Sequence, residues 1–308
     1  MVHHPCFEAF RTRPAAGPLE GTIADSFLGT VRPSFLRYPP VEPGSEGSSQ
    51  FYPAFDNEYF EWVAVLESVL AAHTAYTIGE LGAGYGRWAV RAATAARQRG
   101  LGPVTIIAAE PDPDHYRWLF EHFRANHLDP EEHRLLNVAV EDREGSALFA
   151  VGRPPDQEAV TPEEWFGQAV YWSRLGLYEA AASLGRRVLR MSQPARMRGP
   201  DGWQVIRVRK ITLNNLLLGS GVIDLLDMDI QGSEGRVVAS AMPLLEAKVK
   251  RLYISTHNEG VEPQLRSLLR AHGWTNRVDL PLGRMHDTEF GQAYFGDGVQ
   301  DWINPRLA

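Results

Sequence analysis

Two carboxylates stand at the end of an apolar run in the segment IDLLDMDIQGSE, residues 223–234. Asp227 and Asp229 close the run, and Gln231 and Gly232 turn the chain directly afterwards. A buried carboxylate is costly unless something pairs with it, so two acids at the tip of a core strand usually have a function. We therefore expect a site here, in which the acids hold a metal, a substrate hydroxyl or the positive charge of a cofactor.

A second group of candidates is the glycine-rich segment ELGAGYG, residues 80–86, which stands between an apolar run and a helical pattern. A strand-to-helix turn with several glycines lets a ligand lie against bare backbone. The spacing is GxGxG, and Arg87 occupies the place of the third glycine in the GxGxxG fingerprint of dinucleotide sites. Glu80 would repel a pyrophosphate but attract an ammonium group. S-adenosylmethionine is therefore favoured over NAD, with a purely structural glycine turn as the third reading.

Further acids and strand ends complete the expected cofactor site. Glu110 ends the next predicted strand, where a carboxylate can accept both ribose hydroxyls. Ala139 and Val140 close the third strand, where an adenine would be sandwiched, although a strand end followed by a turn explains them equally well. The expected cofactor-binding residues are Glu80, Gly82, Ala83, Gly84, Gly86, Glu110, Ala139, Val140 and Asp227.

The segment STHNE, residues 255–259, ends the strand after the two acids. Ligands of open α/β sheets bind at the carboxyl ends of the strands, so this segment should reach the same pocket. Methyl transfer to a hydroxyl needs a base, and His257 suits neutral pH because its ordinary pKa is about 6.5. Asp227 is the alternative base. We thus expect catalytic roles for Asp227, Asp229 and His257.

A magnesium ion could lower the pKa of the hydroxyl instead of a base. Its ligands would be Asp229 with His257 or Asn258, and Glu259 as a further oxygen donor, because magnesium keeps several waters and needs few protein groups. The sequence leaves the metal and the metal-free readings open. Glu234 is better explained as an acid in the first turn of a helix, where the helix dipole favours it.

The elements that must position these residues alternate between strand and helix, which predicts a largely parallel α/β sheet with helices on both faces. Strands are expected at 76–81, 104–110, 134–140, 145–151, 203–208, 222–229, 249–256, 274–280 and 289–295. Helices are expected from Asp56 through Leu70, where Phe60, Val63, Leu66 and Leu70 have helical spacing, and at 87–97, 111–127, 235–245 and 261–272, the last closed by Gly273. The tail GDGVQDWINPRL, residues 296–307, predicts a turn and a stop, with Trp302 docking the end of the chain on the core.

The alternating rhythm divides the chain into regions. Residues 1–55 are rich in proline, glycine and serine near their end and predict an irregular arm or linker, and residues 56–308 form one domain. Residues 152–202 interrupt the rhythm as an insertion in which Thr161-Pro162-Glu163-Glu164 is typical of a helix start. Aromatic residues and then arginines follow. The insertion is either packing with a solvated basic face or a lid over the site.

Composition narrows the class of protein. The chain has 308 residues, 44% of them hydrophobic, and a formal net charge of -7, which argues against a general nucleic-acid binder. We see no membrane span and no signal peptide, and a single cysteine, Cys6, excludes an internal disulfide. A cytoplasmic enzyme with a small-molecule substrate is the expectation. A homo-oligomer stays open because the sequence does not fix the oligomeric state.

At this point the sequence resembles the FkbM-type family of class I S-adenosylmethionine-dependent methyltransferases, from about residue 75 to 275. Many methyltransferases share the ExGxGxG pattern, whereas the DIQGSE stretch at 229–234 is more specific to this family. The resemblance implies a Rossmann-like, seven-stranded, mostly parallel sheet with its last strand antiparallel. Many members have Lys where Asp227 stands, and the insertion and the N-terminal arm lie outside the shared core. The residues that carry the likeness are ELGAGYG (80–86), AAEPDPDHYRWL (108–119), NVAVEDREG (137–145), DLLDMDIQGSEGRVV (224–238) and KRLYISTHNE (250–259).

The resemblance also implies O-methylation of sugar or polyketide-like hydroxyls. We therefore expect an S-adenosylmethionine-dependent O-methyltransferase that acts on a small molecule, which can be glycosylated or acidic. Two alternatives stay open: a nicotinamide-dependent oxidoreductase on a related fold, and a non-catalytic S-adenosylmethionine-binding subunit.

Overall fold

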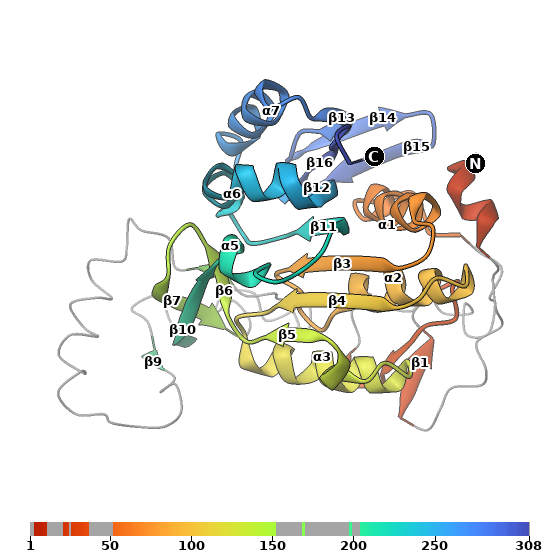
Figure 1. Ribbon diagram of the computed structural model, residues 1–308, viewed down its shortest axis with the longest axis horizontal. Helices are drawn as coiled ribbons and strands as arrows, with labels where there is room; N and C mark the ends of the chain where they lie inside the picture. Colours follow the sequence, from red (N-terminus) through yellow and green to blue (C-terminus); the bar gives the residue numbers. More distant parts are fainter. Residues whose placement is uncertain are drawn as a thin grey trace.

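The computed structural model describes residues 3–10, 21–24, 26–36, 52–151, 168–169, 197–198 and 204–307. Its centre is a seven-stranded sheet, which Figure 1 shows crossing the molecule from β5 to β13. Neighbouring strands are parallel, except that β16 (Gly298–Ile303) is antiparallel to both of its neighbours. This confirms the predicted sheet. In order, its strands are β13 (Thr275–Leu280), β16 (Gly298–Ile303), β12 (Val249–Thr256), β11 (Ile223–Met228), β3 (Tyr76–Leu81), β4 (Val104–Ala109) and β5 (Arg134–Leu136).

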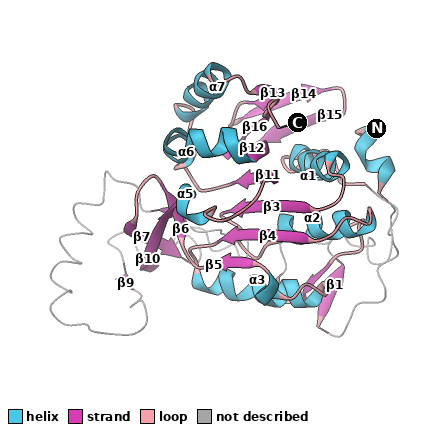
Figure 2. Ribbon diagram, viewed as in Figure 1, coloured by secondary structure: helices cyan, strands magenta, loops and turns pink. Residues whose placement is uncertain are grey.

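Helices cover both faces of this sheet (Figure 2). One core contains α1 (Tyr59–Ala71), α2 (Arg87–Gln98) and α3 (Pro113–Ala125), and the other contains α5 (Leu213–Leu216), α6 (Glu234–Lys248) and α7 (Val261–Ala271). Because side chains of a strand point alternately to opposite faces, Ile106 of β4 joins the first core and Ile107 joins the second. Two-sided burial explains why the strands read as continuous apolar runs.

A second sheet adjoins the end of the first near β5 and α5 (Figure 1). It contains β6 (Ala139–Glu141), β7 (Gly145–Val151), β8 (Gln168–Ala169), β9 (Met197–Arg198) and β10 (Gln204–Thr212). The single strand predicted at 134–140 is therefore wrong, because the chain changes sheets at Asn137. The side-chain Nδ2 of Asn137 donates to the backbone carbonyl oxygens of Glu110 (2.7 Å) and Pro111 (3.1 Å). These hydrogen bonds fix the change of direction beside the end of β4.

The last strand of the main sheet lies further along the chain than predicted. The predicted strand at 289–295 exists as β15 (Gly291–Phe295), but it pairs with β14 (Arg284–Thr288) in a separate hairpin. The seventh strand is β16, in the tail that was predicted to be a turn and a stop. It pairs with β12 and β13, and its first five residues are all buried, whereas β15 pairs with β14 and is mostly accessible to solvent.

The described parts of residues 1–55 form an arm that packs on the domain. They contain the 3-10 helix η1 (Pro5–Ala9) and the strand pair β1 (Thr22–Ala24) and β2 (Val31–Pro33). Phe7 and Phe27 are buried in the same core as α1, and the backbone N–H of Val31 donates to Asn126 after α3. The predicted helix at Thr161 and the predicted lid lie outside the described residues, except for the short strands β8 and β9.

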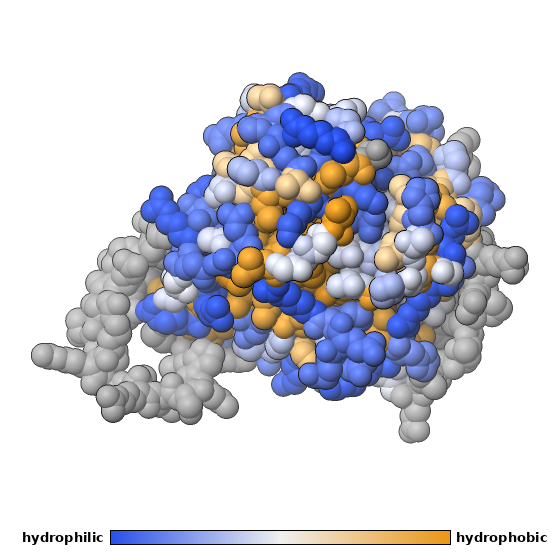
Figure 3. Space-filling model, viewed as in Figure 1, coloured by the Kyte–Doolittle hydropathy of each residue, from blue (hydrophilic) through white to orange (hydrophobic). Residues whose placement is uncertain are grey.

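Apolar side chains reach the surface mainly over the middle of the face shown in Figure 3, and hydrophilic residues surround them. Among the described residues, no helix combines the length and the apolarity that a membrane span requires. The large apolar side chains that are most exposed in this part of the chain are Phe35, Leu218, Val222, Met285 and Tyr294.

Replacement of Trp302 should show that β16 is part of the core. Its side chain is 0% exposed, so Trp302→Ala should lower the free energy of unfolding by about 3–5 kcal/mol. Tyr294→Ala is the matched control, because Tyr294 is 58% exposed in the hairpin, and its effect should stay within about 0.5 kcal/mol. Urea denaturation followed by circular dichroism measures both. Equal losses would contradict the assignment of the seventh strand.

Candidate active site

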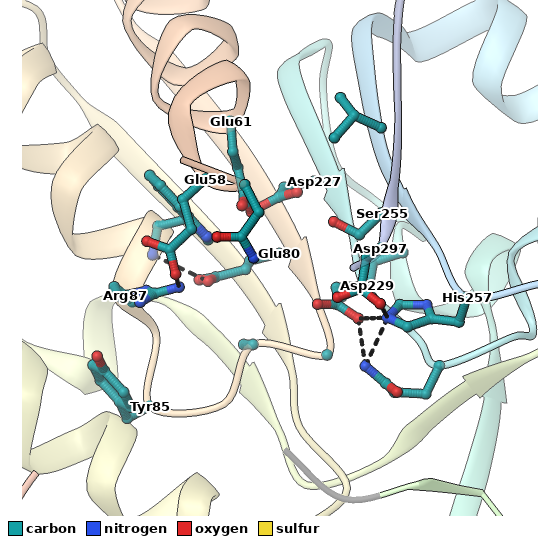
Figure 4. A pocket seen from close by; sticks show the side chains of 17 residues that line it. Glu58, Glu61, Glu80, Tyr85, Arg87, Asp227, Asp229, Ser255, His257 and Asp297 are labelled. Carbon is teal, nitrogen blue, oxygen red and sulfur yellow. Dashed lines mark hydrogen bonds and ion pairs between the residues drawn. The ribbon is translucent and has the colours of Figure 1, made fainter. Parts of the chain in front are cut away.

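A cavity of about 320 Å³ opens at the carboxyl ends of β3, β11 and β12, which is the edge where the sequence predicts a site. Figure 4 shows the labelled acids arranged in two groups, one around Asp227 and the other around Asp229 and His257. Six carboxylates and two cationic side chains line the cavity. The complete lining is Asn57, Glu58, Glu61, Glu80, Leu81, Gly82, Ala83, Tyr85, Arg87, Trp88, Asp227, Asp229, Gln231, Ser255, His257, Asp297 and Val299.

Contacts within the protein, in addition to any ligand, require glycines in the loop at residues 82–86. Gly82, Gly84 and Gly86 all have positive φ angles, of 77°, 54° and 76°. A Cβ atom on Gly82 would lie only 1.8 Å from the backbone oxygen of Asp229, and one on Gly86 would lie 2.9 Å from Phe123. The first glycine is therefore required where the loop crosses the end of β11. This requirement adds to the predicted one, that a ligand lies on the bare backbone.

Glu80 is buried beneath the start of α2. Its two carboxylate oxygens accept hydrogen bonds from the backbone N–H groups of Trp88 (3.1 Å) and Ala89 (3.0 Å). The residue that precedes α2 is Gly86, which has no side chain to cap the helix, so Glu80 caps it from β3. Burial raises the pKa of Glu80 to about 8, and the charge of Asp227 adds to this, while the backbone hydrogen bonds oppose it.

Glu110 joins the glycine loop to the end of β4. Its carboxylate accepts from the backbone N–H groups of Gly84 and Asp112, both at 2.7 Å. Burial raises the pKa of Glu110 well above its ordinary value. A smaller cavity beside Glu110 contains the predicted adenine-binding residues, together with Phe149 from β7, and its residues are Gly82, Glu110, Pro111, Ala139, Val140, Glu141, Phe149, Asp229, Ile230, Gln231 and Ser233.

Asp227 forms a carboxyl pair with Glu61 of α1. The side chain of Asp227 is almost fully buried and hydrogen-bonds with that of Glu61, which Figure 4 shows descending from the helix toward it. The Oδ1 atom of Asp227 has no hydrogen-bond partner among the described residues. Burial raises the pKa of Asp227 to about 7 and that of Glu61 well above its ordinary value, so burial favours a proton on this hydrogen-bonded pair.

His257 lies among acids from three segments. Its Nδ1 atom is 3.1 Å from Glu234 Oε1, and its Nε2 atom is 3.2 Å from Asp229 Oδ1 and 3.6 Å from Asp297 Oδ1. Burial lowers the pKa of His257, but attraction by Asp229 and the hydrogen bond to Glu234 outweigh it and raise the pKa to about 9. Burial raises the pKa of Asp229 to about 6 although His257 opposes the rise.

This arrangement makes Asp229 a better proton acceptor than His257. A ring with a pKa of about 9 is an imidazolium at neutral pH and donates from both nitrogens. The amide nitrogen of Gln231 lies 2.9 Å from both His257 Nε2 and Asp229 Oδ1. Gln231 can donate to the ring only when Nε2 is unprotonated, so it becomes a partner of His257 only after the ring has lost a proton.

The predicted magnesium site does not fit the geometry. Asn258 turns its side-chain oxygen to the backbone N–H of Gly260, at 2.7 Å, and so caps the turn before α7. Both ring nitrogens of His257 face acids, which keep the ring protonated, whereas a metal ligand must be deprotonated. No group of three or more potential ligands suited to a metal occurs within the described residues. In this structure Asp229 is therefore an ion-pair partner of His257.

The comparisons with known proteins identify the family. A model of the methyltransferase FkbM domain matches residues 80–273, which is more than half of the chain. The chain belongs to the FkbM methyltransferase family. A protein of Jannaschia sp. (strain CCS1) named "Putative methyltransferase" is 29% identical over 262 residues, which span 84% of each chain. The resemblance read from the sequence is thus confirmed.

Solved structures of methyltransferases show distant similarity to this FkbM protein. Methyltransferase FkbM from Methylobacillus flagellatus KT has 9% sequence identity and a TM-score of 0.42, with 91% of this chain and 48% of that chain covered. Precorrin-6y C5,15-methyltransferase from Geobacter metallireducens GS-15 has 9% identity and a TM-score of 0.38, with 83% and 94% covered.

Several residues of the FkbM protein's site escaped prediction. Glu61 lies in YFEWVAVL, where a single acid within an otherwise apolar helical run was the available signal. Glu234 lies in the first turn of α6, as predicted, and its carboxylate also hydrogen-bonds with the ring of His257. Glu58 pairs with Arg87 at 2.6 Å across two helices, and Asp297 arrives from the loop before β16, so only the tertiary fold brings these residues to the cavity.

The contact between Gly82 and Asp229 predicts a large effect of a single methyl group. Gly82→Ala should cost more than about 3 kcal/mol of unfolding free energy, because its Cβ would meet backbone in addition to the strain of a positive φ. Gly100→Ala is the control, since Gly100 also has a positive φ, of 74°, but has open space around it, so about 1–2 kcal/mol is expected. Urea denaturation of both variants measures the difference, and similar losses would mean that the crossing is not tight.

The charge of His257 predicts a pH-dependent stability. Its pKa in the folded protein is raised from the ordinary value of 6.5 to about 9, so its stabilising contribution is complete below pH 6.5 and is lost as pH rises through 9. The contribution is on the order of 2–3 kcal/mol. Unfolding free energies of wild type and His257→Gln between pH 6 and 9.5 should therefore converge at the alkaline end. A difference that stays constant over this range would show that the ring is neutral when folded.

Proposed function

We propose that this protein is an S-adenosylmethionine-dependent O-methyltransferase that acts on a hydroxyl group of a small molecule. The observation that carries the proposal is the acidic cavity beside the glycine loop. Asp227 and Asp229 reach this cavity from the end of β11, and Glu61 reaches it from α1. The cofactor's sulfonium and ammonium groups are cationic, so carboxylates attract them. The pyrophosphate of NAD would be repelled by the same groups, which disfavours an oxidoreductase.

The residues present fit the cofactor in two adjoining cavities. The smaller cavity offers Glu110 for ribose hydroxyls and a wall of Ala139, Val140 and Phe149 for adenine. The larger cavity offers the backbone of Gly82 and the buried acids to the methionine part. When bound, the cofactor supplies an electrophilic methyl group on a positively charged sulfur.

Acceptor binding is best supported on the side of Asp229. This carboxylate is partly open to the cavity, and its pKa of about 6 leaves it ionised at neutral pH while it can still take up a proton. The imidazolium of His257, held by Glu234, fixes the position of Asp229. A hydroxyl that donates to Asp229 would be held for attack and would lose its proton there.

The charge of this side also narrows the acceptor. Asp297 and Asp229 line the part of the cavity around Ser255 and His257, and a carboxylate or phosphate on the acceptor would meet both. A neutral molecule with several hydroxyl groups, such as a sugar, has donors for these oxygens and carries no opposing charge. We therefore favour neutral, sugar-like acceptors over acidic ones.

Production of S-adenosylhomocysteine from S-adenosylmethionine tests the proposal against a panel of neutral sugars, their glycosides, sugar acids and polyketide-like alcohols. We expect turnover with a neutral polyol, unaffected by EDTA because the site does not fit a metal. Asp229→Asn should reduce kcat by about 10²–10⁴-fold and leave binding of S-adenosylhomocysteine intact. Glu131→Gln is the control, because Glu131 is exposed and lines neither cavity.

Three results would contradict parts of the proposal. Calorimetric binding of NAD without binding of S-adenosylhomocysteine would exclude the cofactor assignment. Full activity of Asp229→Asn on an accepted substrate would exclude Asp229 as the proton acceptor, and loss of turnover in EDTA would restore the metal reading.

A further inference from the structure

We propose that Glu61 of α1 and Asp227 of β11, which line the cavity beside the glycine loop, together bind the ammonium group of the cofactor's methionine part. This inference rests on the proposed cofactor and deepens it. It assigns a binding role to Glu61, which lies outside the region matched by the family model, residues 80–273.

Position is the first support. Glu61 and Asp227 line the same cavity as Gly82 and Ala83 of the glycine loop, so a ligand that lies on the loop backbone reaches the carboxyl pair. Figure 4 shows the pair between α1 and the end of β11, beside Glu80. The Oδ1 atom of Asp227 is buried without a hydrogen-bond partner among the described residues, and such an atom is costly unless a ligand completes it.

Competition among the other acids is the second support. Glu80 was predicted to meet the ammonium group, but both of its oxygens already accept backbone N–H groups of α2, whereas Asp227 Oδ1 accepts no hydrogen bond within the described residues and so has the greater need of a donor. Glu58 is engaged by Arg87 at 2.6 Å. Glu61 and Asp227 hydrogen-bond with each other. Within the described residues, no cationic side chain lies at hydrogen-bond distance from this pair.

Charge balance explains why two carboxyl groups would be used. Burial raises the pKa of both groups; the charge of Asp227 adds to the rise for Glu61, and the charge of Asp229 adds to it for Asp227, so the protonated form of the pair is favoured. A cation between them would let both ionise, and the released proton would pass to solvent without any change in covalent bonds. The charged or titratable groups that face the pair are Glu58 of the segment before α1, Glu80 of β3, Arg87 of α2, Asp229 after β11 and Tyr253 of β12.

Isothermal titration calorimetry with S-adenosylhomocysteine tests the inference without an acceptor. Titrations at pH 6.5 in two buffers of different ionisation enthalpy measure the protons released on binding. Wild type should release a substantial fraction of one proton and should bind more tightly as pH rises to 8. Glu61→Gln should lose most of this release and bind at least tenfold more weakly, and Asp227→Asn should behave in the same way.

Two controls make the result specific. 5′-Methylthioadenosine lacks the amino acid part, so both variants should bind it as tightly as wild type, which also shows that they are folded. Glu131→Gln, an exposed acid, should match wild type with both ligands. Equal affinity of Glu61→Gln and wild type for S-adenosylhomocysteine, or unchanged proton release, would overturn the inference. Absence of binding by wild type would instead refute the proposed cofactor.

Discussion

The parallel pairing of β3 with β11 is the constraint on which the site depends. Its register places Glu80 directly beside Asp227, and it continues to the hydrogen bond from the Asp229 N–H to the Leu81 carbonyl oxygen at 2.9 Å. Only glycine at position 82 lets the loop pass the Asp229 backbone. One register therefore brings the glycine loop and the acids of two strands to the same edge, where parallel strands of an α/β sheet expose their ligand sites.

Concentrating acids in this way costs electrostatic energy, and the fold offsets only part of it. Backbone N–H groups stabilise Glu80 and Glu110, Arg87 neutralises Glu58, and the imidazolium of His257 serves several acids at once. The remaining charge is met by protonation, since the pKa of Asp227 is raised to about 7. Buried carboxyl groups that are protonated for lack of a cationic partner favour a cationic ligand, because the bound cation lets the carboxyl groups lose their protons and ionise.

The parts of the fold that local sequence patterns determine were predictable. Strands with apolar residues on both faces, the glycine turn and the rule that ligands meet strand ends together brought Glu80, Asp227, Asp229 and His257 to one cavity. The change of sheet at Asn137 could not be foreseen, because it depends on the carbonyl groups at the end of β4. Glu61 escaped for a similar reason. Which face of α1 meets β11 is a matter of tertiary packing, and the two acids of this apolar helix, Glu61 and Glu67, do not reveal it.

The bounds of the family match divide the residues that line the cavity. The matched domain contains the glycine loop, both acidic strands and His257, whereas Glu58 and Glu61 precede it and Asp297 follows it. Elements outside the matched region, the start of α1 and the loop before β16, therefore contribute three of the six carboxylates that line the cavity.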